Sequence, residues 1–178
     1  MGVLANSGLP MIFVQLPYLV LALLPAALVE ALVFRALVSL PLARALPGSL
    51  VANLCSTCVG VPATWLLLLF ADLAVGGGGT WELDTPLLRL AAVTVQAPWL
   101  VPREGQMYWM IPAASLFLML PFFLASVVTE RFVLERWWPD AAGSRLRRAI
   151  WLGNLLSYGA LADYWIVRLL LAEPRHLG

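Results

Sequence analysis

The sequence predicts an all-helical integral membrane protein: a bundle of four transmembrane helices arranged as two similar hairpins. Three observations lead to this prediction: the composition, three long stretches without charge, and a similarity between the two halves. Of the 178 residues, 62% are hydrophobic and only 12% are charged. A soluble domain is about half apolar and a quarter charged. In water, this composition would therefore leave much apolar surface uncovered.

Three stretches contain no charged side chain, namely residues 1–29, 45–71 and 105–129. Each is longer than the ~20 residues that a helix needs to cross a ~30 Å hydrocarbon core. The first stretch lacks the positively charged start of a signal peptide, and its apolar run is too long for one. We therefore expect it to be a retained first helix.

The first predicted hairpin occupies residues 1–75. Its first helix covers residues 9–30 and continues as an interfacial helix toward Leu40. Residues 41–47 hold two prolines around an arginine, and we expect them to form the turn because proline has no N–H group to donate within a helix. The second helix is expected over residues 48–71.

Residues 76–105 are expected to form an extracytoplasmic linker that carries an amphipathic helix at the membrane surface. The linker begins with four consecutive glycines, whose backbone freedom favours a flexible joint. Asp84 and Pro86 are good helix-start residues, and apolar residues follow at helical spacing. Because the stretch is short and contains Arg89, a surface helix is favoured over the alternative of a fifth crossing.

The second predicted hairpin occupies residues 106–178. Its first helix covers residues 106–129 and continues toward a turn at residues 139–144, which contain proline, aspartate, glycine and serine. The last helix is expected over residues 145–172. It is the least hydrophobic of the four because it contains Asp163 and an arginine.

The two hairpins resemble each other in sequence. With one single-residue gap, the matched pairs are Glu30 and Glu130, Val33 and Val133, Arg44 and Arg145, Asn53 and Asn154, Leu54 and Leu155, and Ser56 and Ser157. Similarity at a fixed offset predicts one structural unit used twice. The copies are expected to be parallel and related by a pseudo-twofold axis along the membrane normal.

The arginines predict the orientation in the membrane. The two turns and their flanks hold seven of them: Arg35, Arg44, Arg131, Arg136, Arg145, Arg147 and Arg148. The opposite side holds four: Arg89, Arg103, Arg168 and Arg175. Since cytoplasmic loops carry the excess of basic residues, we expect cytoplasmic turns, with both termini outside, in a bacterial-type inner membrane. Four helices keep both turns on one side, whereas five would export the second.

Several kinds of chemistry are excluded or disfavoured by what the chain lacks. All eleven basic residues are arginine, so there is no lysine for a Schiff base or a P-loop. The only histidine is His176, which disfavours a histidine metal site and a histidine-activated nucleophile. No basic cluster is interleaved with aromatic residues, as nucleic-acid binding would require. We therefore expect no metal, no cofactor and no nucleic-acid partner, and a non-enzymatic protein is favoured over an enzyme.

The candidate site residues begin with the matched polar positions: Glu30, Asn53, Ser56, Glu130, Asn154 and Ser157. At 1.5 Å per residue, Glu30 lies about 31 Å from the start of the first helix, at the inner membrane boundary. Each carboxylate is expected to accept a hydrogen bond from the asparagine of the next helix. The functional interpretation is a pair of sites for an ion, a proton or a lipid headgroup. The favoured interpretation is two hydrogen-bonded contacts that lock each hairpin.

Asp163 is a further candidate. It lies about 22 Å beyond Arg148 along the last helix, past the membrane midplane. An acid at that depth suggests a proton or cation site. The alternative, which is favoured, places it at the outer interface marked by Tyr164 and Trp165, where water or an arginine can reach it.

Cys55 and Cys58 form a C-x-x-C motif and could be a redox pair. They are the only two cysteines, and the predicted topology places them near the reducing side of the membrane. Small buried thiols are therefore the favoured interpretation.

Three functions follow as hypotheses. The leading one is a non-enzymatic scaffold or accessory subunit that contacts the lipid bilayer and either another membrane protein or a second copy of itself. The second is a small transporter or channel that uses the paired glutamate, asparagine and serine positions. The third is a membrane thiol–disulfide oxidoreductase that uses the C-x-x-C motif.

Overall fold

The structure, a computed structural model, describes residues 11–74 and 107–171. Within these ranges the chain forms four helices and no strand: α1 (Met11–Val38), α2 (Leu42–Ala74), α4 (Met107–Trp137) and α5 (Ser144–Leu170). The prediction of an all-helical chain with four long helices is confirmed. The predicted linker and its surface helix lie outside the described residues.

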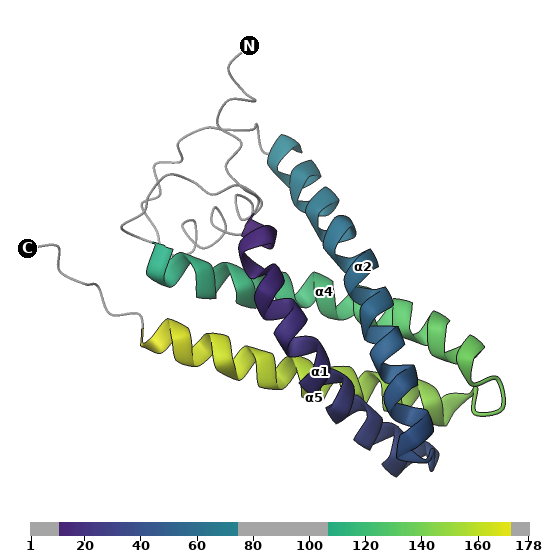
Figure 1. Cartoon of the computed structure of the whole chain (residues 1–178). Coiled ribbons are helices and arrows are strands. Elements are labelled where there is room, and N and C mark those ends of the chain that lie inside the picture. Colours follow the sequence, from purple (N-terminus) through teal and green to yellow (C-terminus); the bar gives the residue numbers. More distant parts are fainter. Residues whose placement is uncertain (1–10, 75–106, 172–178) are drawn as a thin grey trace, which may run out of the picture.

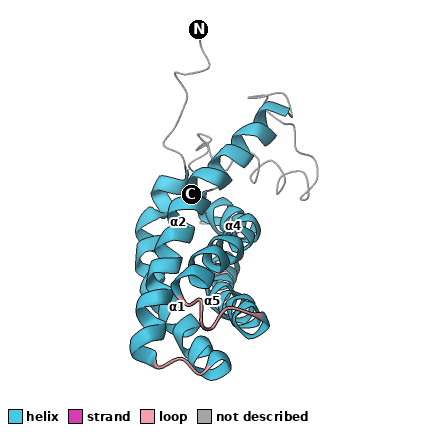
Figure 2. Cartoon of the chain, turned by 90° about the vertical axis from the view of Figure 1, so that its right-hand side faces the viewer, coloured by secondary structure: helices cyan, strands magenta, loops and turns pink. Residues whose placement is uncertain are grey.

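The helices pair as two hairpins laid against each other (Figures 1 and 2). Each helix packs against two others: α1 contacts α2 and α5, and α4 contacts the same two helices. Both interhelical turns lie at the same end of the bundle (Figure 1). At the other end, α2 extends away from the remaining helices.

The first turn is shorter than the sequence suggests. The predicted turn over residues 41–47 is wrong beyond its first residue, because α2 already begins at Leu42 and contains Pro47. The carbonyl of Pro41 accepts hydrogen bonds, each 2.9 Å long, from the backbone N–H groups three and four residues further on. A proline just before a helix sacrifices no helical hydrogen bond. Ser39, with a φ of 60°, supplies the left-handed residue that ends α1.

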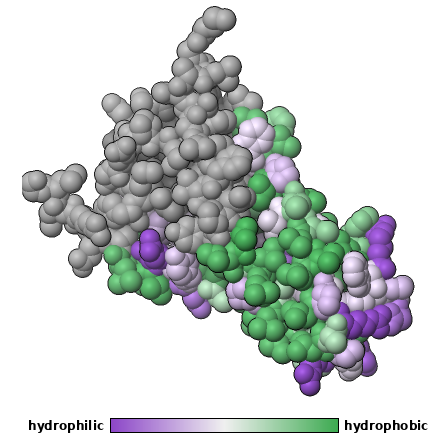
Figure 3. All heavy atoms as spheres, viewed as in Figure 1, coloured by the Kyte–Doolittle hydropathy of each residue, from purple (hydrophilic) through white to green (hydrophobic). Residues whose placement is uncertain are grey.

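Three of the four helices are long and apolar enough to cross a membrane, over Val20–Val38, Leu42–Leu67 and Pro112–Trp137. Large apolar side chains such as Leu21, Leu120 and Val128 point outward and are more than 60% exposed. In Figure 3 hydrophobic residues cover the flank of the bundle, and hydrophilic residues gather at the end that holds the turns. These features are consistent with a multi-pass membrane protein.

The turn end of the bundle is held by an apolar core and an ion pair. Trp138 is fully buried and meets the ring of Phe34 edge to face, at 5.4 Å between centroids. Above this core, Arg44 and Asp140 join the two turns through a bidentate contact of 2.6 and 2.9 Å. The hydrogen bonds from Arg44 hold the pKa of the Asp140 carboxyl below its usual value. Both side chains are exposed, so this ion pair contributes little to the free energy of unfolding, although it connects the two hairpins.

Gly48 is required where α2 meets Trp138. A Cβ atom at this position would lie 2.2 Å from the indole, which is itself fully buried.

We therefore predict that Gly48→Ala lowers the free energy of unfolding by about 1–3 kcal/mol through overpacking. Thermal unfolding in one detergent or lipid system measures it. The matched control is Gly159→Ala, where a Cβ meets nothing within 4 Å. This change should stabilise α5 by about 0.5–1 kcal/mol, and equal effects of the two would contradict the prediction.

Candidate functional site

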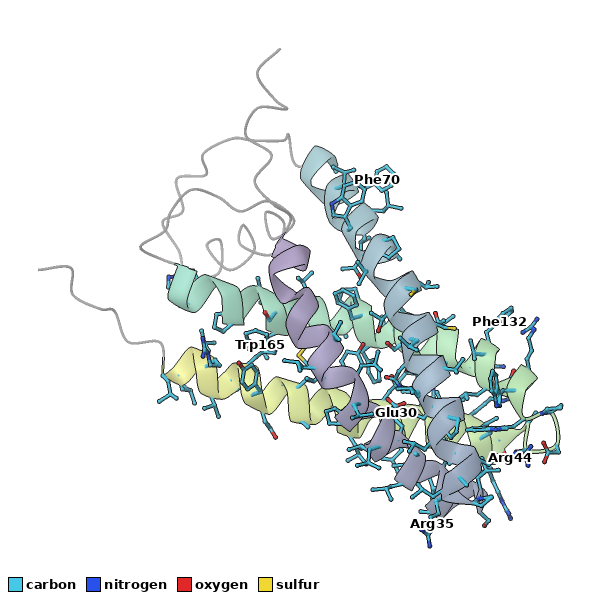
Figure 4. The ribbon with its side chains drawn as sticks, viewed as in Figure 1. Glu30, Arg35, Arg44, Phe70, Phe132 and Trp165 are labelled. Carbon is cyan, nitrogen blue, oxygen red and sulfur yellow. The ribbon has the colours of Figure 1, made fainter. Side chains whose placement is uncertain are left out.

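Two buried glutamates lie at the same level of the bundle, on helices that are diagonal to each other. Glu30 on α1 is 1% exposed and Glu130 on α4 is fully buried. At 1.5 Å per residue, they lie about 12 Å and 10 Å from the turn ends of their helices. In Figure 4 Glu30 lies in the interior, inward of the arginines at the turn end. Burial of this kind is rare for a carboxyl group unless partners surround it.

The Glu30 carboxyl group accepts hydrogen bonds from three side chains. The Ser49 hydroxyl lies 2.9 Å from Oε2, and the Asn53 amide donates to the same oxygen. The Ser157 hydroxyl, which comes from α5, lies 3.2 Å from Oε1. The donors therefore come from both helices that pack against α1.

The Glu130 carboxyl group is bound in a related way by two side chains. The Asn154 amide on α5 lies 2.5 Å from Oε2, and the Ser56 hydroxyl on α2 lies 3.4 Å from Oε1. Each glutamate thus takes an amide from the other helix of its own hairpin and a hydroxyl from the opposite hairpin. The asparagine contacts follow the expectation from the sequence. The serine contacts join what was expected as two separate sites into one network.

The serines reach across because of where they lie on their helices. Ser56 and Ser157 each follow the asparagine by three residues, and each hydroxyl also donates to that asparagine's backbone carbonyl, at 3.0 and 3.1 Å. Gly153 lets α5 approach α1 closely at this level, since a Cβ there would lie 3.0 Å from Cγ of Glu30. Neither Gly153 nor Ser49 is among the site residues predicted from the sequence. The spacing of Ser49, one helical turn before Asn53, was the available signal.

Among the described residues, no arginine forms an ion pair with either of the two carboxyl groups. In the described part of the chain the ion pairs are Arg44–Asp140, Arg131–Glu135 and Arg147–Glu135, all at the turn end. Transferring an unpaired carboxylate from water to a protein interior costs several kcal/mol even after relaxation, and a second like charge nearby adds to that cost. A proton or a bound cation would remove much of it.

One oxygen atom in the network has no donor. The Asn154 amide nitrogen serves Glu130 and the backbone carbonyl of Ile150, at 2.5 and 3.1 Å. Its Oδ1 is buried and accepts no hydrogen bond from the residues that the structure describes. A buried acceptor left without a partner costs about 1–3 kcal/mol. Among the described residues, the network therefore keeps one buried acceptor that a further donor or a cation could satisfy.

The remaining candidates lie outside this network. Asp163 is exposed on α5, five residues beyond Tyr158. Cys55 is half-buried, Cys58 is exposed, and both thiols are free. They lie three residues apart in the middle of a continuous helix, where Cβ atoms are about 5–6 Å apart. A disulfide needs about 3.5–4.5 Å, so this placement gives no support to a redox pair, which stays a prediction.

The geometry defines a class: a helical, multi-pass protein of membrane-spanning character with a paired-carboxylate site in its interior. No protein-family model, curated protein or solved structure matches the chain.

The network predicts energetic coupling between Glu130 and Asn154. Asn154→Leu alone should lower stability by about 1–2 kcal/mol, because it leaves the carboxyl group with only the longer Ser56 contact. The double variant Glu130→Leu/Asn154→Leu should lose less than the sum of the two single variants, since it removes both polar partners. Denaturant unfolding in mixed micelles measures the cycle.

In the control cycle Glu135→Leu replaces Glu130→Leu, and its effects should add within about 0.5 kcal/mol. Additivity in the first cycle would contradict the coupling.

Proposed function

We propose that the protein is a small membrane transporter or channel that moves a proton or a monovalent cation by way of the Glu30–Glu130 pair. The observation that carries this proposal is the burial of two carboxyl groups in one network with no arginine partner within residues 11–74 and 107–171. Acidic residues inside membrane bundles characteristically mark ion pathways and proton relays. A purely structural contact would need only one carboxylate, or none, to join the same helices.

The chemistry of the acceptors supports a small, hard cation. Carboxylate and amide oxygens are hard ligands of the kind that hard cations prefer in proteins. The unpartnered Oδ1 of Asn154 is available to such an ion. A bound cation would neutralise one negative charge of the carboxyl pair, for which the described residues provide no ion-pair partner.

The membrane arrangement that goes with this function has all four helices crossing. α5 is the least apolar, but its 27 residues extend about 40 Å, longer than a ~30 Å hydrocarbon core. Its polar residues Asn154 and Ser157 are buried in the bundle, so they face protein and not lipid. Turns in the cytoplasm of a bacterial-type inner membrane, with both termini outside, follow from the arginine excess around the turns.

The two hairpins are further proposed to be copies of one unit. In support, Glu30, Asn53 and Ser56 match Glu130, Asn154 and Ser157, and the hydrogen bonds are exchanged between the hairpins in the same way for both sets. The correspondence ends at Ser49, which donates to Glu30. Its matched position is Ile150, so the two halves of the site differ by one donor.

The topology predicts that the two turns lie on one face of the membrane. A reporter active only in the cytoplasm should give signal when inserted after Pro41 and when inserted after Gly143, because the turns share the Arg44–Asp140 ion pair. A reporter active only outside should be silent at both positions. Turns found on opposite faces would contradict the parallel hairpins and the shared site.

The transport function predicts ion flux that depends on the pair. In liposomes with an imposed potential, the wild type should take up protons, followed by an internal pH dye, or radioactive Na⁺. Glu30→Gln and Glu130→Gln should each reduce this flux at least tenfold, toward the level of empty liposomes, because they remove the exchangeable charge while keeping the side-chain shape.

Two controls separate this effect from misfolding. Asp163→Asn and Glu135→Gln remove acids that lie outside the network, so both should transport like the wild type. Thermal unfolding of all variants verifies folding. A wild type without flux, or flux that survives both glutamine substitutions, would contradict the proposal.

A second candidate function is that of a scaffold or accessory subunit in a membrane complex. It is favoured by the outer face of α5, where Gly159 and Asp163 are exposed one helical turn apart. Small residues allow close helix approach in membranes, and an exposed acid at that depth is costly unless it is covered or wetted. A wild type that shows no flux, and that purifies in mild detergent in a stoichiometric complex lost in Gly159→Ile, would favour this function.

A further inference from the structure

A cavity of about 300 Å³ lies beside the glutamate pair, on the side away from the turns. All four helices line it: α1 and α2 contribute Leu21 and Ser56, while α4 and α5 contribute Phe122 and Trp165. Its volume is at the lower end of the range for small-molecule sites. Leu21 and Tyr164, which line the cavity, are 73% and 43% exposed, so part of the lining is accessible from outside the bundle. In Figure 4 Trp165 lies on α5, farther from the turn end than Glu30.

The floor of the cavity is shared with the glutamate network. Ser56 lines the cavity, and its hydroxyl also donates to Oε1 of Glu130. Beside it, the Ser126 and Tyr158 hydroxyls are joined by a 2.9 Å hydrogen bond, and both residues line the cavity too. A ligand at this floor is therefore separated from a buried carboxyl group by one side chain only.

The walls are mostly apolar and aromatic. Leu118, Met119, Phe122 and Trp165 form much of the lining, and aromatic faces attract cations when water is excluded. Electrostatic attraction between a cation and a carboxylate is also strong across a few ångströms of low-dielectric protein. These properties favour a ligand that is apolar in shape and positively charged.

We propose that the cavity binds a small hydrophobic organic cation, such as a substituted ammonium ion, in exchange for a proton held by Glu30 and Glu130. This inference rests on the proposed movement of protons through the glutamate pair, and it adds an organic cation as the species exchanged for the proton. The exchange is balanced: one positive charge enters the cavity and one proton leaves the carboxyl pair to water. No bond other than the O–H bond of the carboxyl group breaks, and no further reactant is needed.

The test uses the full chain in lipid nanodiscs with radiolabelled benzyltrimethylammonium as the probe. Equilibrium dialysis should show saturable binding, with about one proton released per cation bound, followed with a pH dye in weak buffer. Binding should weaken at least tenfold in Glu130→Gln, which keeps the cavity walls but removes the charge. Asp163→Asn should bind like the wild type.

A second pair of variants tests the location. Met119→Trp places a larger side chain in the cavity and should weaken binding at least tenfold. Leu124→Trp, on the same helix but 50% exposed and outside the lining, should leave binding unchanged. Thermal unfolding of both variants verifies that they are folded, and Ser126→Phe provides a second way to fill the cavity if Met119→Trp does not fold.

The outcomes separate this inference from the function on which it rests. If the pair-dependent flux is present but benzyltrimethylammonium does not bind, the inference is wrong and the transport function stands. Binding without proton release, or binding unchanged in Glu130→Gln, would show an apolar site for neutral molecules and would also overturn it. If flux and binding are both absent, both proposals are wrong.

Discussion

The burial of two carboxyl groups among four helices is the constraint on which this structure depends. Each glutamate is satisfied only when amide and hydroxyl donors arrive from both neighbouring helices. Rotating any helix by one residue, about 100°, would turn its polar group out of the network. In lipid, where apolar side chains do not by themselves choose one packing over another, such directional contacts fix register and rotation. The same contacts hold both carboxyl groups in the buried interior of the bundle.

The fold could be predicted from the sequence because its signals are long. Each of the three charge-free stretches is long enough to predict a membrane-crossing helix. A chance run of apolar residues would be shorter. The boundary of α2 was missed because Pro47 was interpreted as part of a turn. Two prolines six residues apart also fit a helix in which the first proline precedes the helix and the second lies within its second turn. In the structure Ala45 is buried and Gly48 lies against Trp138, as the helix that begins at Leu42 requires.

The matched polar residues of the network could be predicted from the sequence, whereas Ser49, Gly153 and the hydrogen bonds between the hairpins could not. Matching of the two halves selected Glu30, Glu130 and their asparagines, and spacing along a hairpin pairs each acid with its own amide. Which hydroxyl each acid receives depends on how the hairpins pack face to face, and a linear sequence carries no such information. Gly153 is an example: it leaves room for Glu30 because it has no side chain, and no sequence motif marks a glycine with this role. The cavity could not be foreseen either, because it is formed by residues from all four helices.

The bundle is fastened unevenly along its length. Near the turns, the buried Trp138 and the Arg44–Asp140 bridge hold the hairpins together, while at the far end α2 stands apart from its neighbours (Figure 1). Because both fastenings lie at the turn end, a substitution there would loosen the two hairpins together. A substitution in the far end of α2 would instead leave the contacts around Glu30 and Glu130 in place.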